Sequence, residues 1–470
     1  MAKICSIVFN SISRDARVLK EAHSLQKAGH AVTVLGLTDR NNLIRKETLT
    51  TGVTLLRLDI AAAQKLVGVV TTGGTRVALL SLSLLLIVFA LHSLTGLLWG
   101  AVTGILVSLL TVLFITIVQV RLYYRRIFDI EGDEDLQSSG GILFFLYAIK
   151  DAVPLFVRSI PMYLMVRRLR PEILHCHDVS TLPVGIMAKW LLRCRVVYDA
   201  HEIYEEVAQG SAERARAYRL IHKLGQRRVD AFITINESIA GWYATHYPSL
   251  PPAVLIKNAT SPSDPIEYDG RLHEASIQPR DRKILLYQGG FGTKRGLEYV
   301  VKSAAYLTDE WVLVMMGWGS FESRLRELAE EINLARSEQG RPEAVVFIPP
   351  APQEELALWS AGGTVGIIPY ENIGLNHWFC TPNKLWEYPN AGVPVLVSPF
   401  PELSAPVLKY GYGWLLPDEQ DPEALARQVA ALSDEQIAEA RKNCGEFISQ
   451  DNWGVYESRL VDLYRRISEK

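Results

Sequence analysis

The sequence predicts an α/β protein with two doubly wound parallel sheets that face each other across a cleft. Short β-branched runs alternate with segments of helical periodicity over most of the 470 residues, which is typical of βαβ units. A chain of this length is expected to form two or more domains. A segment with three prolines and mixed charges, 261–282, reads as their linker. We therefore predict a first domain at 1–260, a second at 283–448, and a C-terminal helix at 449–470 that could cross back to the first.

The expected strands of the first domain are Ile4–Phe9, Ala31–Leu35, Val53–Leu58, Ile173–Cys176, Val196–Tyr198 and Ala231–Ile235. Those of the second domain are Ile284–Tyr287, Trp311–Met315, Ala344–Ile348, Val365–Ile368 and Val393–Val397. Helices are expected between them, at Asp15–Ala28, Gly296–Leu307, Phe321–Ala335 and Gln353–Ser360, and the stretch 422–469 is also expected to be helical.

Composition excludes several classes of protein. A net charge of −2 gives no basic surplus for nucleic acid, so no nucleic-acid partner is expected. The N-terminal apolar run is too short for a signal peptide. The cysteines form no CxxC pair, which predicts a reducing cytosol rather than a disulfide framework or zinc ribbon; they are Cys5, Cys176, Cys194, Cys380 and Cys444.

One stretch breaks the soluble pattern. Val77–Val120 has 44 residues without Asp, Glu, Lys or Arg, enough for two helices that cross a bilayer. Small and helix-breaking residues at Ser93–Gly96 and at Gly100 mark the turn. Arginines flank the run at Arg76 and from Arg121 onward, which favours a membrane hairpin with both ends on the cytoplasmic side. A shallow re-entrant hairpin and a buried core hairpin are the alternatives.

The next segment, 141–170, is apolar but interrupted by Lys150, Asp151, Arg158 and two prolines. This pattern suits helices that lie at the membrane interface. An ordinary amphipathic helix that covers a sheet explains it equally well.

Polar residues collect where the predicted strands end, and parallel sheets bind ligands at the carboxyl ends of their strands. In the first domain these residues are Asn10, Ser11, Ser13, Asp15, Arg17, His175, His177, Asp178, Asp199, His201 and Glu202. In the second they are Gly289–Gly296, Gly317–Gly319, Pro349, Pro350, Tyr370 and Glu371. Two such edges facing each other would form a polar cleft.

Two segments of the second domain suit a diphosphate. Gly289–Gly296 follows a strand and opens a helix, where free N–H groups receive phosphate, with Lys294 or Arg295 to neutralise it. The spacing matches neither GxGxxG nor a Walker A loop, and a structural turn is the alternative. In Thr381–Pro394, Pro382 can start a helix that places Lys384 and Glu387 on one face, for a diphosphate and ribose hydroxyls respectively. The alternative there is a surface ion pair.

The pairs His175-x-His177 and Asp199-x-His201 could converge on a metal, since alternate residues of a strand project to one side. No further ligand spacing supports a metal, so a hydrogen-bonding or acid/base role for one histidine is the preferred interpretation. The sequence contains no GxSxG motif that would indicate a nucleophilic hydrolase.

In their order and spacing, these segments resemble the GT-B glycosyltransferases of the large retaining group called family 4. The matching pieces are Asp15–Ala22, Lys27–Val34, Ile173–Asp178, Val196–Glu202, Ile256–Asn258, Gly289–Gly296, Pro382–Glu387 and Ala391–Pro394. They cover nearly all of the chain except the hairpin, and Pro382–Glu387 is the most specific. The resemblance implies two Rossmann-like domains, the second holding a nucleotide-sugar and the first its acceptor.

The resemblance also implies roles for individual residues. Arg295 and Lys384 would meet the donor diphosphate, Glu387 would bind the ribose, and the region around Phe347–Pro350 would hold the base. His201 would approach the donor sugar, and Asp15 would sit near the reacting centre, so these two are the catalytic candidates. Further donor-side candidates are Gly290, Lys294, Asn383 and Glu371, and the acceptor-side candidates are Asn10, Arg17, His177, Asp178 and Glu202.

Two positions depart from the family pattern. Phe379 stands where the family often has a glutamate, and Gly290 where it often has an arginine. A subgroup with a Pro-Asn-Lys motif shows similar changes, so activity is still expected. Glu371 and Asn376 are the candidates for the missing sugar contact.

We therefore expect a retaining transferase that needs no metal or cofactor. It would move a sugar from a UDP- or GDP-sugar to a lipid-linked, polyprenyl-type saccharide at the cytoplasmic membrane face, in surface polysaccharide or glycan assembly. The alternatives are a nucleotide-sugar epimerase of GT-B shape and a non-catalytic membrane partner of a polysaccharide assembly complex. The residues do not name the sugar, the base, the acceptor or the oligomeric state.

Overall fold

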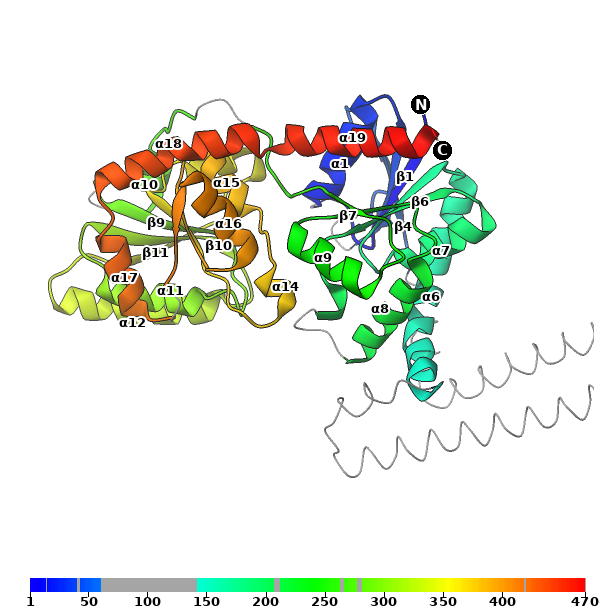
Figure 1. Cartoon of the computed structure of the whole chain (residues 1–470). Helices are drawn as coiled ribbons and strands as arrows, with labels where there is room; N and C mark the ends of the chain where they lie inside the picture. Colours follow the sequence, from blue (N-terminus) through cyan, green and yellow to red (C-terminus); the bar gives the residue numbers. More distant parts are fainter. Residues whose placement is uncertain are drawn as a thin grey trace, which may run out of the picture.

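The chain forms two α/β domains, each built on one sheet (Figure 1). The first sheet has eight strands in the order β3-β4-β2-β1-β5-β6-β7-β8, and the second has six in the order β11-β10-β9-β12-β13-β14. Neighbouring strands are parallel except for β3 and β4. This confirms the prediction of two Rossmann-like domains. The computed structural model describes residues 1–13, 15–39, 43–60, 142–206, 212–262, 266–276, 281–417 and 420–469.

The first sheet comprises β1 (Lys3–Ile7), β2 (Ala31–Leu37), β3 (Lys46–Thr48), β4 (Thr54–Leu58), β5 (Ile173–His177), β6 (Arg195–Ala200), β7 (Ala231–Thr234) and β8 (Ala253–Leu255). Its helices are α1 (Ala16–Lys27), α6 (Ile142–Leu169), α7 (Leu182–Leu191), the 3₁₀ turn η1 (Tyr204–Glu206), α8 (Ala212–Gly225) and α9 (Glu237–His246). Strands β3 and β8 were not predicted. Both are three-residue strands at the two edges of the sheet, where no long apolar run is needed.

The second sheet comprises β9 (Lys283–Gly290), β10 (Trp311–Trp318), β11 (Val345–Ile348), β12 (Val365–Ile368), β13 (Val395–Val397) and β14 (Gly413–Leu415). The helices of this domain are α10 (Arg271–Ser276), α11 (Leu297–Ser303), η2 (Ala304–Tyr306), α12 (Glu322–Glu338), η3 (Gln353–Glu355), α13 (Leu356–Ser360), α14 (Leu375–Trp378), α15 (Lys384–Asn390), α16 (Pro401–Tyr410) and α17 (Pro422–Ala430). Among its described residues, the predicted linker contains one short helix, α10.

Strands β9 and β10 run three residues further than predicted because glycines let their ends approach. A Cβ on Gly317 would lie 1.9 Å from the carbonyl oxygen of Gly289, so only glycine fits there. The pairing continues to Trp318 opposite Gly290. The extension places the glycine-rich loop directly at the edge of the sheet.

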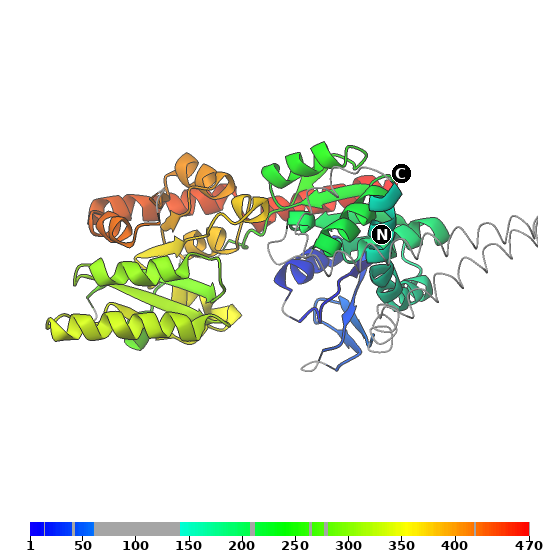
Figure 2. The same cartoon turned by 90° about the horizontal axis from the view of Figure 1, so that it is seen from below.

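The chain ends in two helices, α18 (Asp434–Gln450) and α19 (Trp453–Glu469), which run along both domains (Figures 1 and 2). α18 packs on α15 of the second domain, and α19 packs on α1 and β8 of the first. Trp453 donates from Nε1 to Oγ of Ser24 at 3.1 Å, and the hydroxyl of Tyr464 lies 2.8 Å from Nδ1 of His175. The crossing helix is therefore part of the first domain's core.

Helix α6 packs against α7 and α8, and its Met162, Tyr163 and Val166 are buried in the core of the first domain. This is the arrangement expected of a helix that covers a sheet, and a position at the membrane interface stays a prediction. No helix in the described part of the chain has the length and hydropathy needed to span a bilayer. The predicted hairpin at Val77–Val120 lies outside the described residues.

Candidate active site

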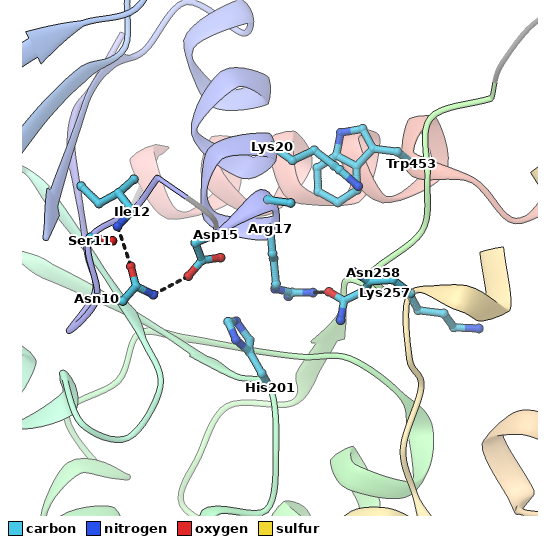
Figure 3. Close-up of a pocket in the computed structure, with 12 residues that line it drawn as sticks. Asn10, Ser11, Ile12, Asp15, Arg17, Lys20, His201, Lys257, Asn258 and Trp453 are labelled. Atoms are coloured by element: carbon cyan, nitrogen blue, oxygen red, sulfur yellow. Dashed lines mark hydrogen bonds between the residues drawn. The ribbon is translucent and has the colours of Figure 1, made fainter. Parts of the chain in front are cut away.

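A cavity of about 380 Å³ lies between the two domains, over the carboxyl ends of the first sheet (Figure 3). The first domain contributes most of its lining, α19 contributes Trp453, and the second domain contributes Asn383. The cavity brings together six residues expected from the sequence: Asn10, Ser11, Asp15, Arg17, His201 and Asn383. Its other lining residues are Ile12, Ala16, Lys20, Lys257, Asn258 and Trp453.

The loop between β1 and α1 is held by its own side chains. Asn10 donates from Nδ2 to Oδ2 of Asp15 at 2.7 Å, and its Oδ1 accepts from the backbone N–H of Ile12 at 2.8 Å. Asp15 is the N-cap of α1, because its Oδ1 accepts from the N–H of Val18 at 3.2 Å. The Asp15 carboxylate is thus fixed at the rim of the cavity, as Figure 3 shows.

Arg17 anchors the floor of the cavity. Its guanidinium bonds both oxygens of Asp199 at 3.0 Å, the carbonyl of Ile256 at 2.7 Å and Oδ1 of Asn258 at 2.9 Å. Its Nε also lies 3.1 Å from the carboxylate of Glu21, one turn along α1. A planar guanidinium can satisfy several acceptors at once, so Arg17 joins α1, β6 and the segment after β8.

His201 lies between two carboxylates. Its Nε2 is 3.0 Å from Oδ2 of Asp199, and its Nδ1 is 3.2 Å from Oδ1 of Asp178. Burial favours the neutral ring, but these two carboxylates prevail and raise the pKa of His201 to about 9. At neutral pH His201 is therefore an imidazolium, and neither of its nitrogens has a lone pair with which to take a proton.

A buried cluster lies beneath His201. One ligand atom each from Glu21, His175, His177 and Asp199 lies within 4.8 Å of the others, and these side chains are at most 1% exposed. The structure thus brings together three of the four residues considered from the sequence as metal ligands, with Glu21 in place of His201. Arg17 already bonds both carboxylates of the cluster, so a cation would lie against a fixed positive charge.

The protonation states of the residues in this cluster follow from their burial. Desolvation lowers the pKa of His175 to about 3 and raises the pKa of Glu21 to about 7. The pKa of Asp199 lies well below its ordinary value because the charges of Arg17 and His201 outweigh its burial. Arg17, Asp199 and His201 therefore form an alternating row of charges that ends at the cavity.

In the second domain, the glycine-rich loop places Arg295 next to Gly290. Arg295 donates from Nη1 to the carbonyl of Gly290 at 3.2 Å, and its guanidinium lies 5.9 Å from the ring centre of Tyr370. Gly296 has a φ of 68°, and a Cβ there would lie 1.9 Å from the carbonyl oxygen of Pro369. Only glycine therefore permits this turn. Lys294, also a predicted donor contact, is exposed at the tip of the loop.

Lys384 and Glu387 lie on α15, beside the same loop. The helix begins at Lys384, with Asn383 as its cap, two residues later than the start at Pro382 predicted from the sequence. Lys384 is buried, and a Cβ on Gly289 would lie 3.1 Å from its Nζ. Burial opposes the charge of Lys384, yet Tyr287, Tyr370 and Glu387 raise its pKa against the influence of Arg295. The structure thus groups a guanidinium, an ammonium and a carboxylate at this edge of the sheet.

The segment that departs from the family pattern spans the two domains. Phe379 packs on the hydrophobic core of the first domain, and its carbonyl accepts from Nδ2 of Asn236 at 2.7 Å. Asn376 accepts from the N–H of Ile203 at 3.1 Å, so this candidate for the missing sugar contact is engaged across the domains. Glu371 instead accepts from the N–H of Gly296 at 3.1 Å, beside Arg295.

Several residues differ from the sequence-based interpretation. Glu202 is exposed, while His177 is buried below the cavity and does not line it. Glu21 was missed, although a charged residue within the apolar stripe of α1 was a visible signal. Lys20 and Asn258 line the cavity as well; both stand in segments that resemble the family, Asp15–Ala22 and Ile256–Asn258, but neither was assigned a role.

Two family models match the chain and together span more than half of it. The model described as "Glycosyl transferase 4-like domain" matches residues 147–259, and the model described as "Glycosyl transferases group 1" matches residues 282–435. Among curated proteins, D-inositol 3-phosphate glycosyltransferase of Thermobispora bispora is 22% identical over 329 residues, which is 64% of this chain and 72% of that protein.

Solved structures share the fold over the whole chain. Sucrose-phosphate synthase from Thermosynechococcus elongatus superposes with a TM-score of 0.66 at 16% identity and covers 100% of both chains. The Anabaena protein HepE, solved in complex with UDP and glucose, gives a TM-score of 0.58 at 10% identity over 99% of this chain and 100% of its own. At such identities the likeness establishes the two-domain architecture.

Proposed function

Since the chain is a retaining GT-B glycosyltransferase of the group 1, hexosyltransferase-like type that uses a nucleotide-sugar donor, we propose that it transfers a sugar from a UDP- or GDP-sugar to a lipid-linked saccharide. The observation that carries the donor half of this proposal is the grouping of Arg295, Lys384 and Glu387 beside the glycine-rich loop. The acceptor half rests on the first domain and its apolar insertion.

The two cations suit the donor diphosphate. Arg295 and Lys384 are both held beside Gly289 and Gly290, where the backbone can approach a phosphate closely. Positive charge and hydrogen bonds there stabilise the nucleoside diphosphate as it leaves, because negative charge grows on it in the transition state. The carboxylate of Glu387, three residues after Lys384, accepts hydrogen bonds from the ribose hydroxyls.

His201 contributes a positive charge and does not act as a base. As an imidazolium held by Asp178 and Asp199, it has no lone pair to accept the acceptor's proton. The proton is taken by the leaving group instead. The hydroxyl of the sugar acceptor enters on the side of the leaving group, and a phosphate oxygen of the departing diphosphate takes its proton. The anomeric configuration is then retained without a protein nucleophile, and no metal is needed for the step.

The apolar insertion in the first domain favours a membrane-bound acceptor. Val77–Val120 interrupts this domain in the sequence, and 44 residues without Asp, Glu, Lys or Arg suit insertion into a bilayer at the cytoplasmic face. A polyprenyl-linked saccharide stays in the membrane, so docking of the acceptor-side domain raises the rate of encounter. A role in surface polysaccharide or glycan assembly follows.

The test is incubation of the purified full chain with a panel of labelled UDP- and GDP-sugars and a membrane lipid extract. Label that moves into the lipid fraction supports the transferase. Conversion of free donor without transfer would indicate an epimerase of GT-B shape instead. Binding without any turnover would indicate a non-catalytic partner of an assembly complex.

A further inference from the structure

Gln288 is a buried polar residue at the end of β9 for which the reaction above has no role. Its side chain is 2% exposed and directly precedes the glycine-rich loop. A buried primary amide is costly unless its donors and acceptor find partners. The partners of this amide lie on two different helices of the second domain.

The side chain of Gln288 links helix α15 to helix α13. Its Nε2 donates to Oε2 of Glu387 at 3.0 Å, and its Oε1 accepts from the hydroxyl of Ser360, the last residue of α13, which shares its proton with the carbonyl of Leu356 at 2.7 Å. A flipped amide would set Oε1 against the Glu387 carboxylate, so an ionised Glu387 and the Ser360 hydroxyl together fix the orientation. The backbone N–H of Gln288 donates to the hydroxyl of Tyr388 at 2.9 Å, which ties the next residue of α15 to the same point.

These bonds also favour the charged form of Glu387. Burial raises the pKa of Glu387, and Lys384 and the Gln288 amide offset only part of this rise. One oxygen of the carboxylate accepts from the amide, and the other accepts no hydrogen bond from the described residues, so it can bind a ligand. A carboxylate held in place before the ligand arrives loses less freedom on binding.

We propose that Gln288 is a positioning residue for the donor ribose, acting through Glu387, with Ser360 fixing the orientation of its amide. This inference rests on the proposed function, since it deepens the ribose role of Glu387. The glutamine determines how strongly the enzyme distinguishes a ribose with hydroxyls from one without them. Its effect is specific to ligands that reach Glu387.

The test compares the affinities of UDP and GDP with those of their 2′,3′-dideoxy forms by calorimetry. Gln288→Met keeps the length of the side chain and removes its hydrogen bonds, and it should weaken binding of the better ribonucleotide about tenfold. The dideoxy form should bind wild type and Gln288→Met equally. Ser360→Ala keeps the bond between Gln288 and Glu387 and removes the bonds of the Ser360 hydroxyl to Gln288 and to the carbonyl of Leu356. It should give a smaller loss of the same kind, and it serves if Gln288→Met fails to fold.

Gln428→Met is the matched control, because Gln428 lies on α17 and donates to the carbonyl of Leu415 on β14, so its bond does not involve α15. It should leave both affinities unchanged. Equal weakening of both nucleotide forms by Gln288→Met, or no weakening, would overturn the inference and leave the proposed function intact. A wild-type chain that binds neither UDP nor GDP would instead overturn the proposed function, and this inference with it.

Discussion

Arg17 and Asp199 form a buried ion pair beneath the cleft, with Nη2 of Arg17 3.0 Å from Oδ1 of Asp199. The two side chains are 9% and 0% exposed. The pair joins the first turn of α1 to the end of β6; Asp15 directly precedes α1, and His201 directly follows β6. It therefore fixes the distance between the two catalytic candidates.

Asp199→Asn should destabilise the protein strongly. It removes the carboxylate that buried Arg17 shares with His201 and leaves Glu21 as the carboxylate beside Arg17. The loss of one partner from a buried pair typically costs about 3–5 kcal/mol. Urea unfolding of the variant and wild type measures the loss. Asp230→Asn is the control, since Asp230 pairs with the part-exposed Lys189 at 2.6 Å and should cost only about 1 kcal/mol. Equal losses for the two variants would contradict the role given to Asp199.

The charge of His201 predicts how stability depends on pH. Its pKa in the folded chain is raised from 6.5 to about 9, so the folded state binds this proton more tightly than the unfolded state. The stabilisation is complete below pH 6.5 and is lost as the pH rises toward 9. The stability of wild type minus that of His201→Gln should therefore fall across this window by about 1–3 kcal/mol. A difference that is constant with pH would show that His201 is not held as a cation.

Phe379→Glu restores the acidic residue often found in the family and tests what this position does here. Phe379 packs on the core of the first domain, so a carboxylate there should cost about 1–3 kcal/mol without raising kcat/KM for the donor. Phe379→Leu, which stays apolar, should keep most of the stability. Thermal unfolding and transfer assays measure the two effects. Higher turnover with unchanged stability would show that the phenylalanine only replaces a sugar contact.

Replacement of Val77–Val120 by a short flexible linker should separate the two halves of the proposed function. Transfer to a lipid acceptor in vesicles should fall at least tenfold, because the acceptor-side domain loses its membrane anchor. Binding of UDP or GDP should stay unchanged, since the donor contacts lie in the second domain. Full activity of the trimmed chain on the lipid acceptor would refute the docking role.

Much of the fold could be predicted because buried parallel strands read as continuous apolar runs. The range Val365–Ile368 was predicted to the residue, whereas β10 continues past Met315 to Trp318. The extension depends on the close approach of Gly317 to Gly289, a contact between strands that no local pattern reveals. β14 was not predicted because a strand of three residues is too short to show an alternating hydrophobic pattern.

The candidate site could be predicted only in part. Arg295, Lys384 and Glu387 stand in recognisable local motifs, and the structure groups them. Tyr464 and His175 are 289 residues apart, so their contact depends on how α19 crosses to the first domain. The hydrogen bonds that Asn376 and Phe379 of the second domain make with the first domain likewise depend on how the two domains are arranged.

Calorimetric titration of UDP and GDP into wild type, Arg295→Ala and Lys384→Met tests the central claim most directly. Each substitution removes a cation from the proposed diphosphate contact and should weaken the better nucleotide at least tenfold, since hydrogen bonds between charged groups are the strong ones. Lys302→Met is the control, because Lys302 lies on α11 and pairs with Glu298 at 3.9 Å. It should bind like wild type. Unchanged affinity in both Arg295→Ala and Lys384→Met would contradict the assignment of the donor site.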